Sequence, residues 1–324
     1  MGIYLNSTNA FGLFCEDYSL TYYVDKTEII RELIPLLEMK YPSAGQRKSG
    51  SGKSPKYVCI TRPRRFGKSV MANMIAAFFG KGIDSSEIFD RLKVSQYPWY
   101  HEHLNQHNVI HIYFNETPRN CHSYEQYIAR IENKLLDDLA DAYPNAKITQ
   151  NDTVWDALTS IYSRYHGEKF IFVFDEWDYI FHQSFATDDD KKAFSNFLNA
   201  LLKDKAYVEM AYITGVLPIA KYSSGSELNM FFEFTMASMK EFSEYFGFTD
   251  EEVDELYQRY LEQNENPSIS RDDLALWYDG YQTISGKRLY NPRSIVGALT
   301  YNHLGSFWTS SGPYDEIYYY VINP

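Results

Sequence analysis

The sequence contains little cysteine and no long apolar run. Its three cysteines, Cys15, Cys59 and Cys121, are widely spaced and form no C-x-x-C pair. Neither a disulfide framework nor a zinc site is therefore indicated. No apolar segment approaches the roughly 20 residues that span a bilayer, and the N-terminus lacks a basic-then-apolar signal segment. These absences predict a cytoplasmic protein with no membrane contact.

Positive charge is also scarce. The formal net charge is −12, which gives no support to a surface that binds nucleic acid. The histidines are scattered and form no metal constellation, and no Ser-His-Asp or Cys-His arrangement can be argued. Aromatic residues, in contrast, make up 17% of the chain. Because aromatic side chains supply interfaces as well as cores, we expect a protein partner or self-association.

Apolar runs and helical stretches alternate through the first two thirds of the chain. Such alternation implies βαβ units and a parallel sheet covered by helices on both faces. The sequence therefore predicts an α/β core over residues 1–236. The predicted strands are residues 56–61, 108–114, 169–174, 207–214 and 230–236, and the predicted helices are residues 69–79, 123–143, 153–165 and 191–204.

The pattern changes after about residue 237. Only helices are predicted there, at residues 238–246, 249–263, 271–281 and 292–304. We interpret residues 237–324 as a smaller, all-helical lid subdomain. Asp279 and Gly280 are expected to form a turn within it. In the core, the polar stretch 43–56 is interpreted as a flexible linker insertion.

The tripeptide Gly-Lys-Ser, which ends the phosphate-binding loop of many nucleotide hydrolases, occurs at residues 52–54 and 67–69. Such a loop follows a buried strand and opens a helix, whose first N–H groups then face the phosphate. The first copy lies in the linker and precedes a strand, so Lys53 is interpreted as a solvated lysine. The second copy follows strand 56–61 and opens helix 69–79, which makes Lys68 the candidate.

The loop before Lys68 departs from the Walker A pattern G-x-x-x-x-G-K-[ST], because Arg62 stands where the first glycine is required. Lys68 would reach the β- and γ-phosphates of ATP, and Ser69 would ligate Mg²⁺. The arginines beside Lys68 either supplement its charge or point into solvent. The predicted nucleotide contacts are Arg62, Pro63, Arg64, Arg65, Phe66, Gly67, Lys68, Ser69 and Val70.

A Mg²⁺-dependent hydrolase also needs an acidic residue at the end of an adjacent strand, the Walker B position. The strongly apolar strand 169–174 leads directly into Asp175, a predicted Mg²⁺ ligand, and Glu176, which is placed to polarise an attacking water. Alone, the two carboxylates are as well explained by a solvated strand end. Thr214 ends the next strand and is a candidate γ-phosphate sensor, or alternatively a helix cap.

Several segments, in order along nearly the whole chain, resemble the AAA-ATPase-like family. They are residues 2–6, 23–30, 62–69, 172–178, 213–222, 247–253, 275–281 and 290–299. The family comprises bacterial proteins that look like STAND- or AAA-type P-loop ATPases and usually carry a C-terminal nuclease-like domain of the PD-(D/E)XK type. The chain stops roughly where that domain would begin, so we expect a fragment or a protein without it, and assign no nuclease activity.

The resemblance implies that Lys68 and Ser69 contact phosphate and Mg²⁺, that Asp175 and Glu176 form the acidic pair, and that Arg62 is normal at its position. In related ATPases an N-terminal segment lies against the nucleotide base, which makes residues 23–30 a candidate. Asp25 within this segment is expected to cap a helix, with Glu28 three residues on.

Near the other end of the chain, Pro292 opens a predicted helix. Its resemblance to a proline of STAND-type ATPases implies a contact with adenine. Arg293 follows it and either senses the γ-phosphate or is simply exposed.

The leading hypothesis is a slow Mg-ATP hydrolase of the AAA/STAND type that drives a conformational switch. The alternative is a nucleotide-gated protein-interaction scaffold with little hydrolysis, possibly the regulatory half of a nuclease or defence system. The acidic Glu176 favours the first hypothesis, and the aromatic-rich helical part favours the second.

Overall fold

The structure is a computed structural model that describes residues 2–37, 56–222, 228–236, 241–284 and 286–307. Lys53, and with it the first Gly-Lys-Ser copy, lies outside these residues. The α-helices are α1 (Thr8–Tyr18), α2 (Ile29–Leu37), α3 (Lys68–Phe79), α4 (Ser86–Phe89), α5 (Tyr100–His103), α6 (Tyr124–Ala142), α7 (Val154–Arg164), α8 (Asp188–Leu202), α9 (Ile219–Tyr222), α10 (Asp250–Gln263), α11 (Arg271–Tyr278) and α12 (Pro292–Tyr301). The strands are β1 (Tyr57–Thr61), β2 (Asn108–Tyr113), β3 (Phe170–Asp175), β4 (Val208–Gly215), β5 (Phe232–Phe234), β6 (Asp279–Gln282) and β7 (Arg288–Tyr290), and the short 3₁₀ helices are η1 (Lys93–Gln96), η2 (Pro144–Ala146) and η3 (Tyr179–His182).

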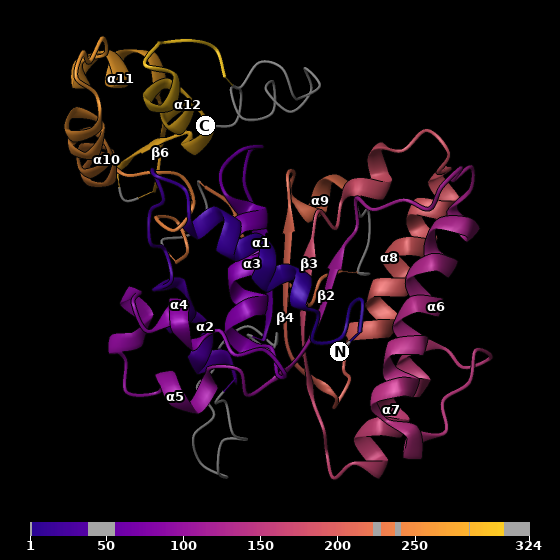
Figure 1. Cartoon of the computed structure of the whole chain (residues 1–324). Coiled ribbons are helices and arrows are strands. Elements are labelled where there is room, and N and C mark those ends of the chain that lie inside the picture. The colour runs from indigo at the N-terminus through magenta and orange to yellow at the C-terminus, as the bar shows by residue number, and fades with distance from the viewer. Residues whose placement is uncertain (1, 38–55, 223–227, 237–240, 285, 308–324) are drawn as a thin grey trace, which may run out of the picture.

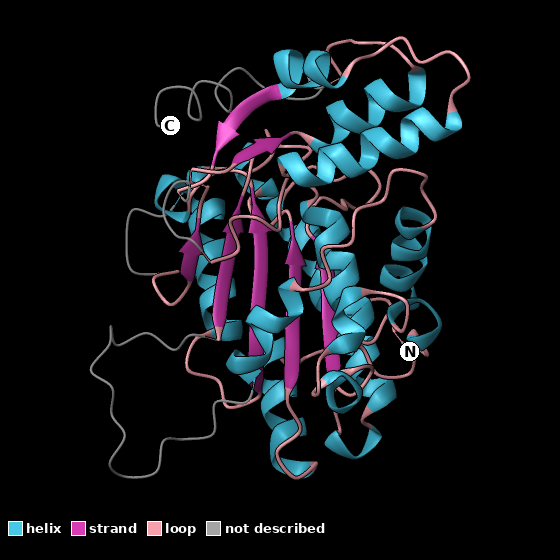
Figure 2. Ribbon diagram, turned by 90° about the vertical axis from the view of Figure 1, so that its left-hand side faces the viewer, coloured by secondary structure: helices cyan, strands magenta, loops and turns pink. Residues whose placement is uncertain are grey.

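Five parallel strands form the central sheet in the order β2-β3-β4-β1-β5, which confirms the predicted parallel sheet. Helices α6, α7 and α8 cover one face, and α1 and α3 lie on the other (Figure 1). Nearly every residue of β1 to β4 is buried. Strands covered on both faces are expected to be continuous apolar runs, which explains why their bounds could be read from the sequence. The strands point toward the C-terminal part (Figure 2).

Alternation along β3 divides the core into two clusters. Phe170, Phe172 and Phe174 pack on the side of α6, α7 and α8. Ile171 and Val173 belong to the cluster that contains α3. Asp175 continues the second set, because successive side chains in a strand point to opposite faces. The strand therefore delivers its terminal carboxylate to the face on which α3 begins.

The N-terminal residues are held against the edge of the sheet. The carboxylate of Asp138 on α6 accepts hydrogen bonds from the backbone N–H groups of Ile3 (2.9 Å), Tyr4 (2.6 Å) and Leu5 (3.0 Å). Leu5 also forms an antiparallel bridge with Ile110 of β2. Segment 2–6 thus extends the sheet beyond β2 by one short contact.

Asp25 does not cap α2 as predicted. One of its oxygens accepts hydrogen bonds from the N–H and hydroxyl of Thr27, and the other accepts from the N–H of Lys93 at 2.7 Å. Glu28 accepts from the hydroxyl of Tyr97 at 2.9 Å instead of reaching back to Asp25. The helix begins later, at Ile29. Asp25 therefore fixes a turn and fastens it to η1.

The C-terminal part is not all-helical. Strands β6 and β7 form a two-stranded antiparallel sheet, and Asp279 pairs with Tyr290 where a turn was predicted. The predicted helix 238–246 is also wrong, because its described residues, 241–246, form turns and bends. Helices α10, α11 and α12 pack around a separate apolar cluster, to which Tyr22 of the N-terminal segment contributes. Strands β6 and β7 are only four and three residues long, too short to show a clear alternating pattern in the sequence.

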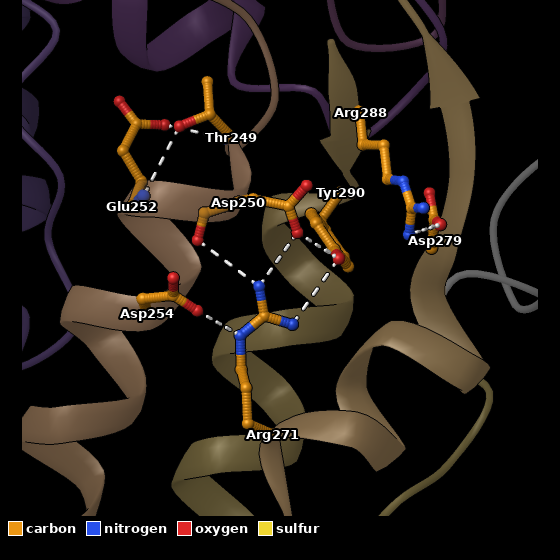
Figure 3. A network of polar contacts seen from close by, with 8 residues as sticks. All are labelled: Thr249, Asp250, Glu252, Asp254, Arg271, Asp279, Arg288 and Tyr290. Carbon is orange, nitrogen blue, oxygen red and sulfur yellow. Dashed lines mark hydrogen bonds and ion pairs between the residues drawn. The ribbon is translucent and has the colours of Figure 1, made fainter.

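A polar network centred on Arg271 joins α10, α11 and β7 (Figure 3). Its guanidinium donates to Asp254 at 2.5 Å, Asp250 at 2.9 Å and the hydroxyl of Tyr290 at 3.4 Å. Tyr290 in turn donates to Asp250 at 2.6 Å. Because β7 leads directly into α12, this network helps to set the position of Pro292.

None of the described helices is long and apolar enough to cross a bilayer.

Candidate nucleotide-binding site

The loop of residues 62–67 joins β1 to α3 at the carboxyl edge of the sheet. Gly67 adopts a left-handed backbone with φ of 82°, which a glycine reaches without steric cost, and is the N-cap of α3. Arg65 also has a positive φ, of 70°. No side-chain hydrogen bond within the described part of the chain caps this end of α3. A helix start of this kind presents backbone N–H groups and a positive dipole end, which together favour an anion.

Lys68 is the first residue of α3 and is buried. Its ammonium donates to the carbonyl oxygens of Arg62 at 2.9 Å and Pro63 at 3.0 Å, so it lies against the inner side of the loop. Burial lowers the pKa of Lys68, and the carboxylates of Asp175, Asp178 and Glu176 oppose that shift. The lysine predicted to bind phosphate therefore faces the acidic strand end.

Asp175 and Thr214 end two adjacent strands and contact each other. The hydroxyl of Thr214 donates to the buried carboxylate of Asp175 and lies 3.4 Å from the backbone N of Glu176. Strand β4, which carries Thr214, pairs with β1 on one side and β3 on the other. Thr214 thus stands between the loop strand and the acidic strand, where it is fully buried, and it caps no described helix.

Glu176 has a left-handed backbone, with φ of 52°. That conformation costs a residue other than glycine of order 1–3 kcal/mol, and strain of this kind clusters at functional sites. Burial raises the pKa of Glu176, as does Asp175, whereas Lys68 and Arg64 lower it. The side chain is therefore a carboxylate of raised basicity, next to the lysine and the loop.

The loop arginines point in different directions. Arg62 is fully buried, and its guanidinium donates to the carbonyls of Thr61 (2.8 Å), Phe234 (2.5 Å) and Phe242 (3.1 Å). The side chain of Arg62 therefore braces the loop from behind, and only its backbone carbonyl faces Lys68. Arg64 and Arg65 are exposed. Burial lowers the pKa of Arg65, and the neighbouring charges of Arg293 and Arg64 add to that shift.

A cavity of about 750 Å³ brings these elements together. The predicted site residues that line it are Arg64, Arg65, Phe66, Gly67, Lys68, Ser69, Val70, Glu176 and Pro292. Arg293 and residues 23, 24, 26 and 27 of the predicted base-binding segment line it as well. Of the remaining site predictions, Arg62, Pro63, Asp175 and Thr214 lie behind this surface. The lining residues that were not predicted as site residues include Asp17, Leu20, Phe248, Gly297 and Phe307, which come together only through the fold.

The C-terminal part touches the loop directly. The side-chain amide of Asn291, the N-cap of α12, donates to the carbonyl of Arg64 at 3.4 Å. Phe66 is buried in a small cluster with Met236 and Leu289, against which Tyr281 packs. The loop is therefore clamped between the sheet and the β6–β7 hairpin.

Comparison with known proteins agrees with this geometry. The sequence model of a family described as "Predicted AAA-ATPase" matches residues 51–224, more than half of the chain, which include the loop, the acidic pair and Thr214. The chain belongs to this AAA-ATPase-like family. Its architecture is that of a P-loop nucleotide hydrolase, and membership in the family supports nucleotide binding.

The AAA-ATPase-like chain also resembles two individual proteins. It is 25% identical over 303 residues to an uncharacterized protein encoded in the vnfD 5′ region of Azotobacter chroococcum mcd 1. That alignment covers 92% of this chain and 51% of the relative, so the chain spans about half the length of the relative. A solved structure of ORC2 from Aeropyrum pernix, described as ADPNP–ADP complexes, matches 85% of this chain and 60% of that one, with a TM-score of 0.37 and 11% identity. A similarity of that size establishes nothing further here.

Proposed function

We propose that this protein binds Mg-ATP in the 750 Å³ cavity and hydrolyses it slowly to drive a conformational switch. The observation that carries the proposal is the meeting of opposite charges at the start of α3. Lys68, Arg64, Arg65 and Arg293 supply positive charge to one cavity whose wall also carries Glu176. A polyphosphate would relieve the repulsion among the arginines, and the exposed N-terminus of α3 would add to its binding.

Residues of the site divide by the chemistry they offer. Lys68 and the backbone of the loop are placed to hold phosphate, and Glu176 to orient a water. The hydroxyl of Ser69 and the carboxylate of Asp175 are hard oxygen donors of the kind that Mg²⁺ prefers. When bound, the ion would neutralise charge on the phosphates. Thr214 fixes the orientation of Asp175 through its hydroxyl.

The base and ribose would then extend away from the loop, toward the apolar wall formed by the N-terminal segment and α12. Leu20, Val24, Phe248 and Val296 line this end of the cavity, together with Pro292. The volume of about 750 Å³ lies within the range of ordinary small-molecule sites. Residues 237–324 would act as a lid, because the part that is described contacts both the loop and the base end of the cavity.

A nucleotide-gated scaffold is the second candidate. Helix α11 exposes Leu276 and Trp277 at 82% and 52%, and α12 exposes Tyr301 at 70%. Exposed apolar residues of this size are what a protein interface uses. Tyr301 also lines the nucleotide cavity, so a partner there would sense its occupancy.

Nucleotide titration and ATP turnover of the wild type and three variants test the proposal. Lys68→Ala should weaken Mg-ATP binding at least about tenfold, because the loop loses its only buried ammonium among the described residues. Glu176→Gln should bind as the wild type does and lose about 100-fold in turnover. Lys53→Ala, in the other Gly-Lys-Ser copy, is the matched control and should change neither. Wild-type turnover no higher than that of Glu176→Gln would reject the hydrolase in favour of the scaffold. Loss of binding in Lys53→Ala alone would reject the choice of loop.

A further inference from the structure

Asp178 lies two residues beyond Glu176 and is almost completely buried. One oxygen of its carboxylate accepts hydrogen bonds from the backbone N–H groups of Val216 at 2.8 Å and Leu217 at 3.4 Å. The same oxygen accepts from the hydroxyl of Tyr222 on α9 at 3.3 Å. A single carboxylate thus ties the segment after β3 to the segment after β4.

Two further hydrogen bonds join the same segments nearer to the sheet. The backbone N–H of Trp177 donates to the carbonyl of Thr214 at 3.0 Å, and that of Glu176 faces the hydroxyl of Thr214 at 3.4 Å. Gly215 separates Thr214 from Val216, and a Cβ placed on it would lie 3.2 Å from the carboxyl carbon of Asp178. The two segments are therefore packed as closely as glycine allows.

This contact reaches the nucleotide cavity. Val216 and Glu176 both line it, one from each segment. The left-handed backbone of Glu176 is unfavourable for that residue, so it persists only where the surroundings hold it in place. Asp178 supplies such a restraint from the far side of Trp177.

The charge of Lys68, in the nucleotide site, also acts on the carboxylate of Asp178. Burial raises the pKa of Asp178, while the N–H of Val216 and the charge of Lys68 lower it. A buried carboxylate is costly unless it is paired and hydrogen-bonded. Three hydrogen bonds satisfy the carboxylate here, and one donor, the N–H of Val216, belongs to a residue that lines the nucleotide cavity.

We propose that Asp178 is a positioning residue, which holds the 214–217 segment against the acidic loop so that Glu176 keeps its orientation toward the γ-phosphate. This role rests on the proposed ATP hydrolysis. It differs from that of Lys68 or Ser69, because Asp178 does not line the cavity. It differs from that of Asp175, because Asp178 acts through the backbone of the 214–217 segment and not as a Mg²⁺ ligand. Loss of the contact should therefore slow turnover without weakening nucleotide binding.

The test is Asp178→Asn in the full chain, compared with the wild type and with Asp188→Asn. The asparagine keeps the shape and one acceptor oxygen but loses the charge. Asp188, whose side chain is 99% exposed, provides the matched control for removal of a carboxylate. In Asp178→Asn we expect kcat for ATP to fall about tenfold or more with KM within about threefold of the wild type. Amide hydrogen exchange at residues 216 and 217 should become about tenfold faster, with β2 unchanged.

Asp178→Glu provides a second variant in case the asparagine variant does not fold. It keeps the charge and both oxygens, and part of the lost kcat should return. Unchanged kcat and unchanged exchange in Asp178→Asn, beside an active wild type, would overturn the role of Asp178 alone. An equal loss of binding and turnover would show a structural role and also overturn it. A wild type without turnover would instead reject the proposed hydrolysis, and with it this role.

Discussion

The ring of Phe66 packs edge to face against the ring of Tyr281, with 4.8 Å between centroids and an interplanar angle of 78°. Phe66 belongs to the loop of residues 62–67 and Tyr281 to β6, so the contact joins the candidate nucleotide site to the C-terminal part. Gly247 lies against the ring of Phe66, since a Cβ placed on Gly247 would be 3.1 Å from that ring. Movement of the β6–β7 hairpin should therefore displace the loop.

Phe66→Leu should weaken this clamp. We expect a loss of about 1–1.5 kcal/mol in the free energy of unfolding, because an aromatic pair and some buried volume disappear. Mg-ATP affinity should fall severalfold as well, since the loop loses its support. Phe170→Leu is the control: Phe170 opens β3, at the opposite end of that strand from Asp175, and packs edge to face against Tyr143. It should lose similar stability and keep its affinity. Equal losses of affinity in both variants would contradict the clamp.

Arg62→Lys tests whether the arginine braces the loop or binds phosphate. One ammonium cannot span the three carbonyls that the guanidinium reaches, nor stack on Phe246, whose ring centroid lies 5.1 Å away. We expect a loss of about 2 kcal/mol in urea unfolding. Arg164→Lys, which disturbs a single exposed carbonyl contact, should change stability by less than about 0.5 kcal/mol. An Arg62→Lys variant that keeps its full stability but loses ATP affinity would instead support Arg62 as a phosphate ligand.

The sequence was sufficient to predict the sheet and the position of the second Gly-Lys-Ser copy between a strand and a helix. Buried parallel strands are uninterrupted apolar runs, so their bounds differ from the predicted ones by at most one residue at each end. The exception is the short strand β5, which covers only the centre of the predicted run 230–236. Lys68 was selected over Lys53 by the order of strand and helix, a local property. Both features depend on residues close together in the chain.

The remaining features depend on contacts between distant residues. The direction of the Arg62 side chain is set by carbonyls at positions 234 and 242, which nothing in the loop reveals. The pairing of Asp279 with Tyr290, which replaced a predicted turn, is an exception: the hairpin is local, but its strands are too short to show an alternating pattern. The cavity wall formed by Leu20, Phe248 and Phe307 could not be predicted either, since three separate segments meet there.

Gly215→Ala should disturb the acidic loop by steric overlap. The new Cβ would lie 2.6 Å from Nε1 of Trp177, a fully buried side chain with little room to move. Overpacking of this kind costs typically 1–3 kcal/mol, and we expect turnover to fall together with the melting temperature. Gly280→Ala is the matched control, because its Cβ would meet nothing within 4 Å. Equal stability of the two alanine variants would show that the contact at Gly215 relaxes without cost.

Asp250→Asn should reveal a pH-dependent contribution from the network of Figure 3. Burial alone would raise the pKa of Asp250, but hydrogen bonds from Tyr290 and Arg271 outweigh it and lower the pKa. A carboxyl group with a lowered folded pKa stabilises the fold above its unfolded value, about 4, and loses that contribution as the pH falls through the folded value. Because the side chain is 44% exposed, we expect a loss of only about 1 kcal/mol at pH 7 and low salt, which disappears as the pH falls through the folded pKa. Urea unfolding at several pH values measures it, with Asp188→Asn as the exposed control. A difference that stays constant with pH would show that shape, and not charge, makes Asp250 important.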